Sequence, residues 1–390
     1  MAYSSSTAVI DTPSSRYRRL WIPDLAWILL LTLLAVVPFL TPGTDLKILS
    51  WFYHPGLPHA WPLEFNGFFR FLYTFGTLPA LITALAGLGF LVVARYRPSL
   101  TPWRRHAVFI FLTLVIGPGF LVNTVFKDHW GRPRPKMVSE FGGRMEYQCF
   151  HEKGMSGRGK SFPCGHSSMG YYFIVLYFLA RRRKKLIRFS LLAGIMIYGT
   201  VIGIARMAAG AHFASDVLWS AVFPCLTAWA LYYFVLNIPF HEDYPAVTRE
   251  KSIWRSKWLL WLAPPLGLAT IGAVLLSTPS FAELDYKEVI PKGSNPIVEL
   301  VVAKPGHPYP DFCIIDQKTS ATHSDRIIIT GEIQGFGWPW NHIRHSAIWS
   351  RTNGVDLFRF TCIPKGQFSE LDGRLTIEVP SGTQIHLIQP

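Results

Sequence analysis

Residues 160–185 read KSFPCGHSSMGYYFIVLYFLARRRKK. A short segment with cysteine and histidine opens this stretch, an apolar run follows, and a cluster of Arg and Lys closes it. An apolar run that ends in such a basic cluster is typical of a membrane helix whose basic end faces the cytoplasm. The stretch therefore predicts a membrane span with Cys164 and His166 at its outer end.

The composition supports a membrane protein. Of the 390 residues 50% are hydrophobic, and the mean hydropathy is +0.24. These values are too apolar for a soluble enzyme of this length and favour a membrane core with one soluble domain. The net charge of +14 accompanies repeated apolar runs, so it indicates cytoplasmic Arg and Lys that anchor spans, with no nucleic acid as partner.

Seven apolar stretches approach the roughly 20 residues that a helix needs to cross a bilayer. They lie near 24–41, 73–95, 106–126, 167–180, 187–205, 213–237 and 258–277. We expect an α-helical polytopic membrane bundle, with six helices in the core and a seventh span. Its expected parts are a cytoplasmic tail (1–23), the embedded core (24–240), and a cytoplasmic loop with the seventh span (241–277).

Basic residues set the expected orientation. They cluster before the first span and in alternate loops after it, at 95–105, 181–185 and 249–257, so these loops are expected in the cytoplasm. The loop 127–163 is then outside, yet it is also basic. A basic loop on the outer side is best explained by binding of an anionic group.

After residue 278 the long apolar runs give way to short β-rich runs, which predicts a soluble β domain at 278–390. Short β-rich runs at 296–303, 326–333, 356–363, 374–379 and 384–388 are separated by turn sequences such as TNG, LDG and PSG. With seven spans this domain is extracytoplasmic. The sequence leaves its role and its partner open, and its aromatic segment GFGWPW (335–340) suits either a binding edge or the core.

Three outer segments carry residues suited to chemistry. In KDHWGRPRP (127–135), Lys127 and Arg134 lie on a loop shaped by Pro and Gly, an arrangement that suits a tetrahedral oxyanion. The alternative is a basic stretch that contacts lipid headgroups.

The second segment is PCGH (163–166) at the start of a helix. Gly165 permits close backbone approach, helix N-termini attract phosphate, and His166 can donate a proton to a leaving oxygen. The alternative is a capping segment in which Ser167 and Ser168 are the caps.

The third segment is ARMAAGAHFASD (205–216). His212 and Asp216 share one helix face if the sixth span begins here, and a carboxylate one turn away can hold an imidazole in one tautomer for nucleophilic attack. Arg206 lies at the outer end of the fifth span. The alternative is an interfacial Arg beside a satisfied His–Asp pair.

The order and spacing of these segments resemble the type 2 phosphatidic-acid phosphatase family, whose site vanadium haloperoxidases share. Lys127 precedes Arg134 by seven positions, PCGH follows, and Arg206 precedes His212 by six. The resemblance covers roughly residues 70–237. It implies a six-helix membrane fold with an active site at the outer face.

The resemblance also implies a role for each matching residue. His212 would attack phosphorus and form a phosphohistidine, Asp216 would orient it, and His166 would protonate the leaving group and then activate water. The phosphate-binding residues would be Lys127, Arg134, Arg206 and Gly165. No metal and no other cofactor is implied, because the cations neutralise the charge of the transition state.

Two positions depart from the family, which usually has Ser in place of Cys164 and of Ala205. A thiol is a weaker donor than a hydroxyl, which puts that phosphate contact in question, and Cys164 as the nucleophile is an alternative. Cysteines on the outer side also fit two disulfides. The expected pairs are Cys149–Cys164 and Cys313–Cys362, and the alternative is two free buried thiols in each region.

The segment EFGG (140–143), the nearby Cys149 and the outward-facing site resemble bacterial lipid A phosphatases of this family. A densely anionic glycolipid would also suit the basic outer loop. We therefore expect a phosphoric monoester hydrolase of the bacterial inner membrane, with its site in the periplasm and a glycolipid or phospholipid as substrate. Undecaprenyl diphosphate, phosphatidylglycerophosphate and phosphoryl transfer between lipids stay open. The other classes are a haloperoxidase and a membrane anchor that displays the β domain.

Overall fold

The computed structural model describes residues 19–41, 43–57, 59–143, 145–154, 159–243, 272, 278–291, 296–302, 313–320, 325–352 and 355–388. The chain divides into two compact units, residues 1–261 and 262–390, and each is described by itself. Most of the expected cytoplasmic tail and the seventh span, apart from Gly272, lie outside the described residues.

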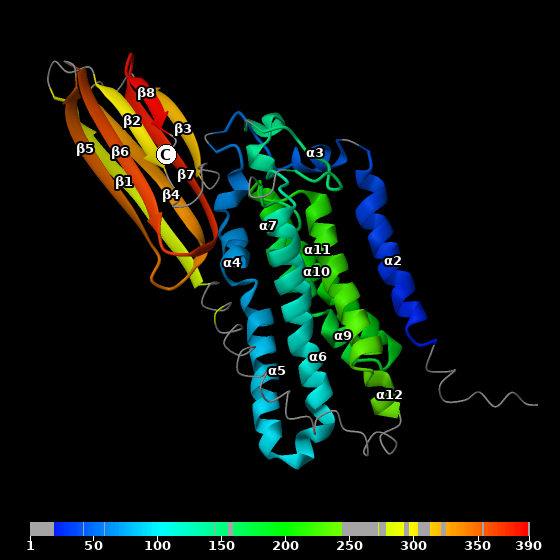
Figure 1. The fold of residues 1–390 in the computed structure, drawn as a ribbon. Helices are drawn as coiled ribbons and strands as arrows, with labels where there is room; N and C mark the ends of the chain where they lie inside the picture. The colour runs from blue at the N-terminus through cyan, green and yellow to red at the C-terminus, as the bar shows by residue number, and fades with distance from the viewer. Residues whose placement is uncertain are drawn as a thin grey trace, which may run out of the picture. The chain divides into compact units, whose positions relative to one another are not determined.

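The first unit is a helical bundle (Figure 1). Its long helices are α2 (Ile22–Val36), α4 (Gly67–Phe75), α5 (Leu78–Tyr96), α6 (Arg104–Leu114), the π-helix η4 (Val115–Phe126), α10 (Lys185–Ala208) and α11 (Ala214–Ala230). Within the described residues they form five stretches that are long and apolar enough to cross a membrane: Ile22–Phe39, Gly67–Tyr96, Pro98–Phe126, Lys185–Ala208 and Ala214–Val235. These stretches match the first, second, third, fifth and sixth expected spans and confirm the membrane bundle.

The fourth expected span consists of two short helices, α8 (Gly165–Tyr171) and α9 (Ile174–Leu179). Most of their side chains are buried, whereas the other long apolar helices expose many large apolar side chains. A Cβ added at Gly170 of α8 would lie 2.7 Å from the Cα of Gly199 in α10. The glycines therefore let α8 pack closely against α10, as small residues do between membrane helices.

Short elements complete this unit. They are η1 (Val37–Phe39), α3 (Thr44–Leu49), η2 (Pro62–Phe65), η3 (Pro98–Trp103), α7 (Lys127–His129), η5 (Pro135–Met137), η6 (Ser139–Phe141), η7 (Leu231–Val235) and α12 (Ile238–Asp243). The segment with η5 and η6 packs on aromatic side chains from an earlier part of the chain. The Phe141 ring lies 5.1 Å from that of Tyr53 and 5.5 Å from that of Trp61, between centroids.

The second unit is a β-sandwich, which confirms the expected β domain. One sheet has the order β1-β4-β7-β3 and the other β5-β6-β2-β8. The strands are β1 (Thr278–Val289), β2 (Ile297–Val302), β3 (Cys313–Ser320), β4 (Arg326–Gly337), β5 (His342–Thr352), β6 (Val355–Lys365), β7 (Phe368–Pro380) and β8 (Gln384–Ile388). Alternate residues of β2 are buried, as one face of each strand packs into the core.

The structure contains neither expected disulfide, so this prediction was wrong. Cys149, Cys164, Cys225 and Cys362 are all free thiols. The two thiols of the first expected pair are both buried, with Cys164 0% exposed and Cys149 8% exposed. The positions of cysteines along the chain indicate a shared side of the membrane, but they do not determine which side chains face each other.

Candidate active site

His212 is completely buried, and one nitrogen of its ring has a defined partner. Its Nδ1 lies 2.5 Å from the carbonyl oxygen of Ser161. A carbonyl only accepts hydrogen bonds, so Nδ1 carries the proton in the neutral ring and the lone pair is on Nε2. Nε2 has no hydrogen-bond partner among the described residues. This tautomer leaves a nitrogen suited to nucleophilic attack.

Asp216 does not share a helix face with His212, contrary to the expectation. The helix α11 begins at Ala214, after His212, and Asp216 accepts the N–H of Phe213 at 2.8 Å in its first turn. Its carboxylate lies 3.8 Å from Nδ1 of His212 but accepts a hydrogen bond from the Ser161 hydroxyl at 2.6 Å. Asp216 thus fixes Ser161, whose own carbonyl orients the histidine.

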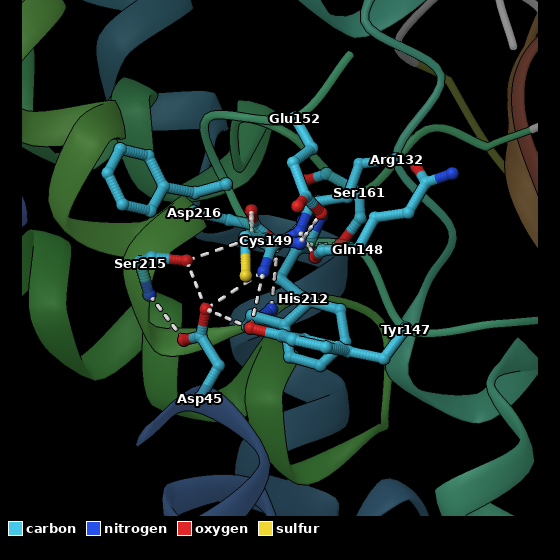
Figure 2. Close-up of polar contacts among 12 residues, drawn as sticks. Asp45, Arg132, Tyr147, Gln148, Cys149, Glu152, Ser161, His212, Ser215 and Asp216 are labelled. Carbon is cyan, nitrogen blue, oxygen red and sulfur yellow. Dashed lines mark hydrogen bonds and ion pairs between the residues drawn. The ribbon is translucent and has the colours of Figure 1, made fainter. Parts of the chain in front are cut away.

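Arg132 links Asp216 to a second buried carboxylate (Figure 2). Its Nη1 donates to Oδ1 of Asp216 at 2.5 Å, and its Nη2 donates to Oδ2 of Asp45 at 2.8 Å. Asp45, on α3, also accepts the N–H of Ser215 at 2.9 Å. Burial disfavours the charge of Arg132, but the two carboxylates outweigh it, so its pKa is raised.

Sequence reasoning missed Arg132 and Asp45. Arg132 occupies an unspecified position between Lys127 and Arg134, and Asp45 belongs to a distant segment with no motif. The only local signal was an extra arginine inside the first motif.

A tyrosine that the sequence did not single out connects His166 and Arg206. The Tyr73 ring of α4 stacks on the imidazole of His166, with centroids 5.0 Å apart and planes 21° from parallel. The guanidinium carbon of Arg206 lies 4.2 Å from the centroid of the same ring. Both side chains are nearly buried. Tyr73 therefore contacts both the expected proton donor and an expected phosphate ligand.

Gly165 and Cys164 lie at the start of α8. A Cβ at Gly165 would lie 2.5 Å from Oδ1 of Asn123, so only glycine fits here without displacing that side chain. The alternative in which Ser167 and Ser168 cap the helix is wrong. Their hydroxyls donate instead to the carbonyl oxygens of Gly199 and Gly165, at 2.6 and 2.7 Å.

Cys164 and His212 shift each other's pKa. Burial raises the pKa of the Cys164 thiol, but the neighbouring His212 and the more distant Arg206 outweigh burial, and the net shift is downward. For His212, burial favours the neutral ring, but Cys164 and Asp216 outweigh it and raise the pKa. The thiol therefore helps to determine the pH at which the histidine becomes neutral.

The other two expected phosphate ligands are also buried. Lys127 begins α7 and is 7% exposed, and Arg134 directly precedes η5 and is 5% exposed. A buried cation is stable only when its charge is compensated. Arg206, the third expected cationic ligand, is buried as well, with 2% of its surface exposed. Among the described residues, no group of three or more His, Cys, Asp and Glu side chains could hold a metal ion.

The glycines of EFGG shape the loop after Arg134. Gly142 ends η6 with a φ of +81°, and a Cβ at Gly143 would collide with the backbone of Met137. The N–H of Met137 in turn donates to the carbonyl oxygen of Arg134 at 2.9 Å. The two glycines thus permit the tight turn that packs against the backbone following Arg134.

Comparison with known proteins agrees with this geometry. The sequence profile of the PAP2 superfamily matches residues 107–239, which contain all three motifs. A protein of Francisella tularensis subsp. novicida (strain U112), named lipid A 4'-phosphatase, is 36% identical over 197 residues, which are 49% of this chain and 86% of that protein. The chain belongs to the PAP2 superfamily.

Two further relatives of this PAP2 protein, also named lipid A 4'-phosphatase, match over shorter stretches. The protein of Rhizobium leguminosarum is 39% identical over 27% of this chain and 45% of its own length. That of Rhizobium etli is 35% identical over 27% of this chain and 40% of its own length. No solved structure matches. The relatives confirm the expected class, a phosphoric monoester hydrolase, and the PAP2 profile ends before the β-sandwich.

Proposed function

We propose that this chain hydrolyses a phosphate ester of a lipid A-type glycolipid through a phosphohistidine at His212. The observation that carries the proposal is the hydrogen bond from Nδ1 of His212 to the Ser161 carbonyl, at 2.5 Å, which leaves the lone pair of the buried Nε2 for the substrate. Asp216, 3.8 Å from Nδ1, stabilises the positive charge that the ring gains when Nε2 bonds to phosphorus.

In the first step, Nε2 of His212 forms a bond to phosphorus while the bond from phosphorus to the sugar oxygen breaks. His166 gives its proton to that departing oxygen. Lys127, Arg134 and Arg206 neutralise the non-bridging oxygens, on which charge is spread in the transition state. The product of this step is a free sugar hydroxyl and a phosphorylated His212.

In the second step, the neutral His166 takes a proton from a water molecule. The water oxygen attacks phosphorus, the phosphorus–nitrogen bond breaks, and inorganic phosphate leaves. Nε2 regains its lone pair, and His166 is again protonated. Every proton in this cycle is transferred by a residue of the chain or by water.

Two observations favour a lipid A-type substrate. The three relatives are all named lipid A 4'-phosphatase, so the 4'-phosphate is the first bond to test. The basic segment 127–163 suits a densely anionic headgroup. If the basic loops at 95–105, 181–185 and 249–257 face the cytoplasm as expected, this segment lies on the other side of the membrane. We therefore place the site at the periplasmic face of a bacterial inner membrane.

The proposal is tested by phosphate release from lipid A, undecaprenyl diphosphate and phosphatidylglycerophosphate. The wild-type protein is compared with His212→Ala and with the control His151→Ala, since His151 is exposed in the same outer segment. We expect release from lipid A by the wild type and the control, and none by His212→Ala. Equal release by all three proteins would exclude the mechanism, and preference for another lipid would exclude the substrate.

A further inference from the structure

One end of the β-sandwich carries two stacked tryptophans. Trp338 and Trp340 lie between β4 and β5, with ring centroids 5.0 Å apart and planes only 14° from parallel. Trp340 is 67% exposed, although an indole is among the largest apolar side chains. We call residues 337–341, together with 366–367 from the neighbouring loop, the tryptophan tip.

Hydrogen bonds fix the tryptophan tip in one conformation. The Asn341 side chain accepts the N–H of Gln367 at 3.1 Å and donates to its carbonyl oxygen at 2.6 Å. The indole N–H of Trp338 donates to Oε1 of Gln367 at 2.9 Å. Gly366 has a φ of +113°, and a Cβ there would collide with Asn341. The exposed Trp340 therefore stacks on a rigid support.

The strand register places the tryptophan tip at the end where the chain enters the domain. Thr278, the first residue of β1, pairs with Gly337, the last residue of β4 and the neighbour of Trp338. Paired strands lie about 4.8 Å apart. Directly before Thr278 the sequence is WLLWLAPPLGLATIGAVLLS, the expected seventh span. If that run crosses the bilayer, the tryptophan tip lies at the bilayer surface.

Exposed basic side chains lie next to the tryptophan tip. Residues 278–282, 337–344 and 365–368 contain no Asp or Glu, whereas His342, Arg344 and Lys365 are all exposed. At the opposite end of β4, the exposed pair of Asp325 and Arg326 carries both signs. Exposed tryptophan beside cations matches the membrane–water interface, where indoles lie at headgroup depth and Arg or Lys attract anionic lipids.

We propose that the tryptophan tip is a membrane-surface contact that binds the phospholipid headgroups of the outer leaflet. The indoles of Trp338 and Trp340 enter the headgroup region, and Arg344 and Lys365 pair with lipid phosphates. The contact restrains the domain at a second point besides its chain connection, and it does not depend on the phosphatase chemistry.

A spin label placed between the tryptophans tests the contact in the full chain. Pro339 is exposed, and Pro339→Cys keeps both indoles. The background is Cys313→Ser, because the other native cysteines are at most 8% exposed and react poorly. The control is Ser381→Cys, an exposed position in the turn between β7 and β8. Both proteins are reconstituted into phosphatidylcholine–phosphatidylglycerol vesicles.

We expect the label at 339 to be more accessible to oxygen, which partitions into the bilayer, than to a water-soluble nickel chelate. The label at 381 should show the reverse order. Adding Trp340→Ser to Pro339→Cys should raise its nickel accessibility toward that of position 381. A label at 339 as accessible to nickel as that at 381 would overturn the proposal. So would immobilisation of this label by a soluble glucosamine disaccharide bisphosphate but not by the vesicles.

Discussion

Nη1 of Arg132 lies 2.5 Å from Oδ1 of Asp216, while Nη2 of the same guanidinium lies 2.8 Å from Oδ2 of Asp45. Asp216 also accepts a hydrogen bond from the Ser161 hydroxyl. The carbonyl oxygen of Ser161 in turn accepts a hydrogen bond from Nδ1–H of His212. A continuous series of buried contacts thus connects α3 with the nucleophile. Its members are held by charge as well as by packing, so changes far from phosphorus should affect the reaction.

Asp45→Asn tests this series at its far end. The change keeps the shape of the side chain but removes the charge that Arg132 faces, so we expect a loss of about 1–3 kcal/mol in the free energy of unfolding. The measurement is denaturant unfolding in detergent, followed by tryptophan fluorescence, which gives the free energy of unfolding. Arg182→Ala is the control, because Arg182 is 61% exposed in its pair with Asp243, and such pairs contribute about 0–1 kcal/mol. Equal losses in both variants would contradict the structural role of Asp45.

Cys164→Ser should shift the pH profile of the reaction. Burial lowers the pKa of His212, but the Cys164 thiol and Asp216 raise it by more, so the neutral nucleophile appears only at a higher pH. Serine carries no charge in the pH range of the assay, so the substitution removes one of the contributions that raise the pKa of His212. The acid limb of the kcat profile should therefore move to lower pH, while the protein stays active. An unchanged acid limb would show that the thiol does not affect the histidine.

Tyr73→Leu should weaken catalysis, whereas Tyr73→Phe should not. The aromatic face, rather than the hydroxyl, contacts His166 and Arg206. A cation–π contact contributes about 0.5–2 kcal/mol, which corresponds to a loss of about 2- to 30-fold in kcat/KM. Steady-state kinetics of the two variants provides the comparison. Equal activity of the leucine and phenylalanine variants would exclude a role for the ring.

Gly165→Ala should reduce kcat, because the added Cβ meets Oδ1 of Asn123 and forces that side chain to move away from the start of α8. Asn123→Ala in the same protein removes this clash and should restore part of the activity. Gly194→Ala is the matched control, since nothing lies within 4 Å of its Cβ position in α10. A double variant as inactive as the single one would refute the steric explanation.

Much of the bundle could be predicted because a bilayer imposes length and apolarity on each span. The break between α8 and α9 at residues 172–173 had no such signal, since a buried helix pair is as apolar as a span. In the β-sandwich, the expected runs correspond to β2, β4, β6, β7 and β8, whereas β1, β3 and β5 were missed. The exposed face of β5 carries polar residues such as Arg344 and Ser346, which obscure the strand pattern.

The candidate site was predictable only where its residues are close in sequence. The spacing from Arg206 to Asp216 singled out His212 but placed it on one helix face with Asp216. The helix α11 begins only after His212, and the hydrogen-bond partner of its Nδ1 is the Ser161 carbonyl. The contact of Tyr73 with His166 brings together distant parts of the chain, which no local pattern specifies. The disulfide prediction failed for the same reason, because sequence positions do not show which distant cysteines face each other.

The central claim is that phosphorus becomes bonded to His212. Its most direct measurement is a rapid quench at high pH during turnover of lipid A, followed by mass-spectrometric mapping of the phosphorylated peptide. We predict phosphate on His212 in the wild type and none in His212→Ala. Phosphate on Cys164, or no phosphorylated protein in any variant during turnover, would contradict the account.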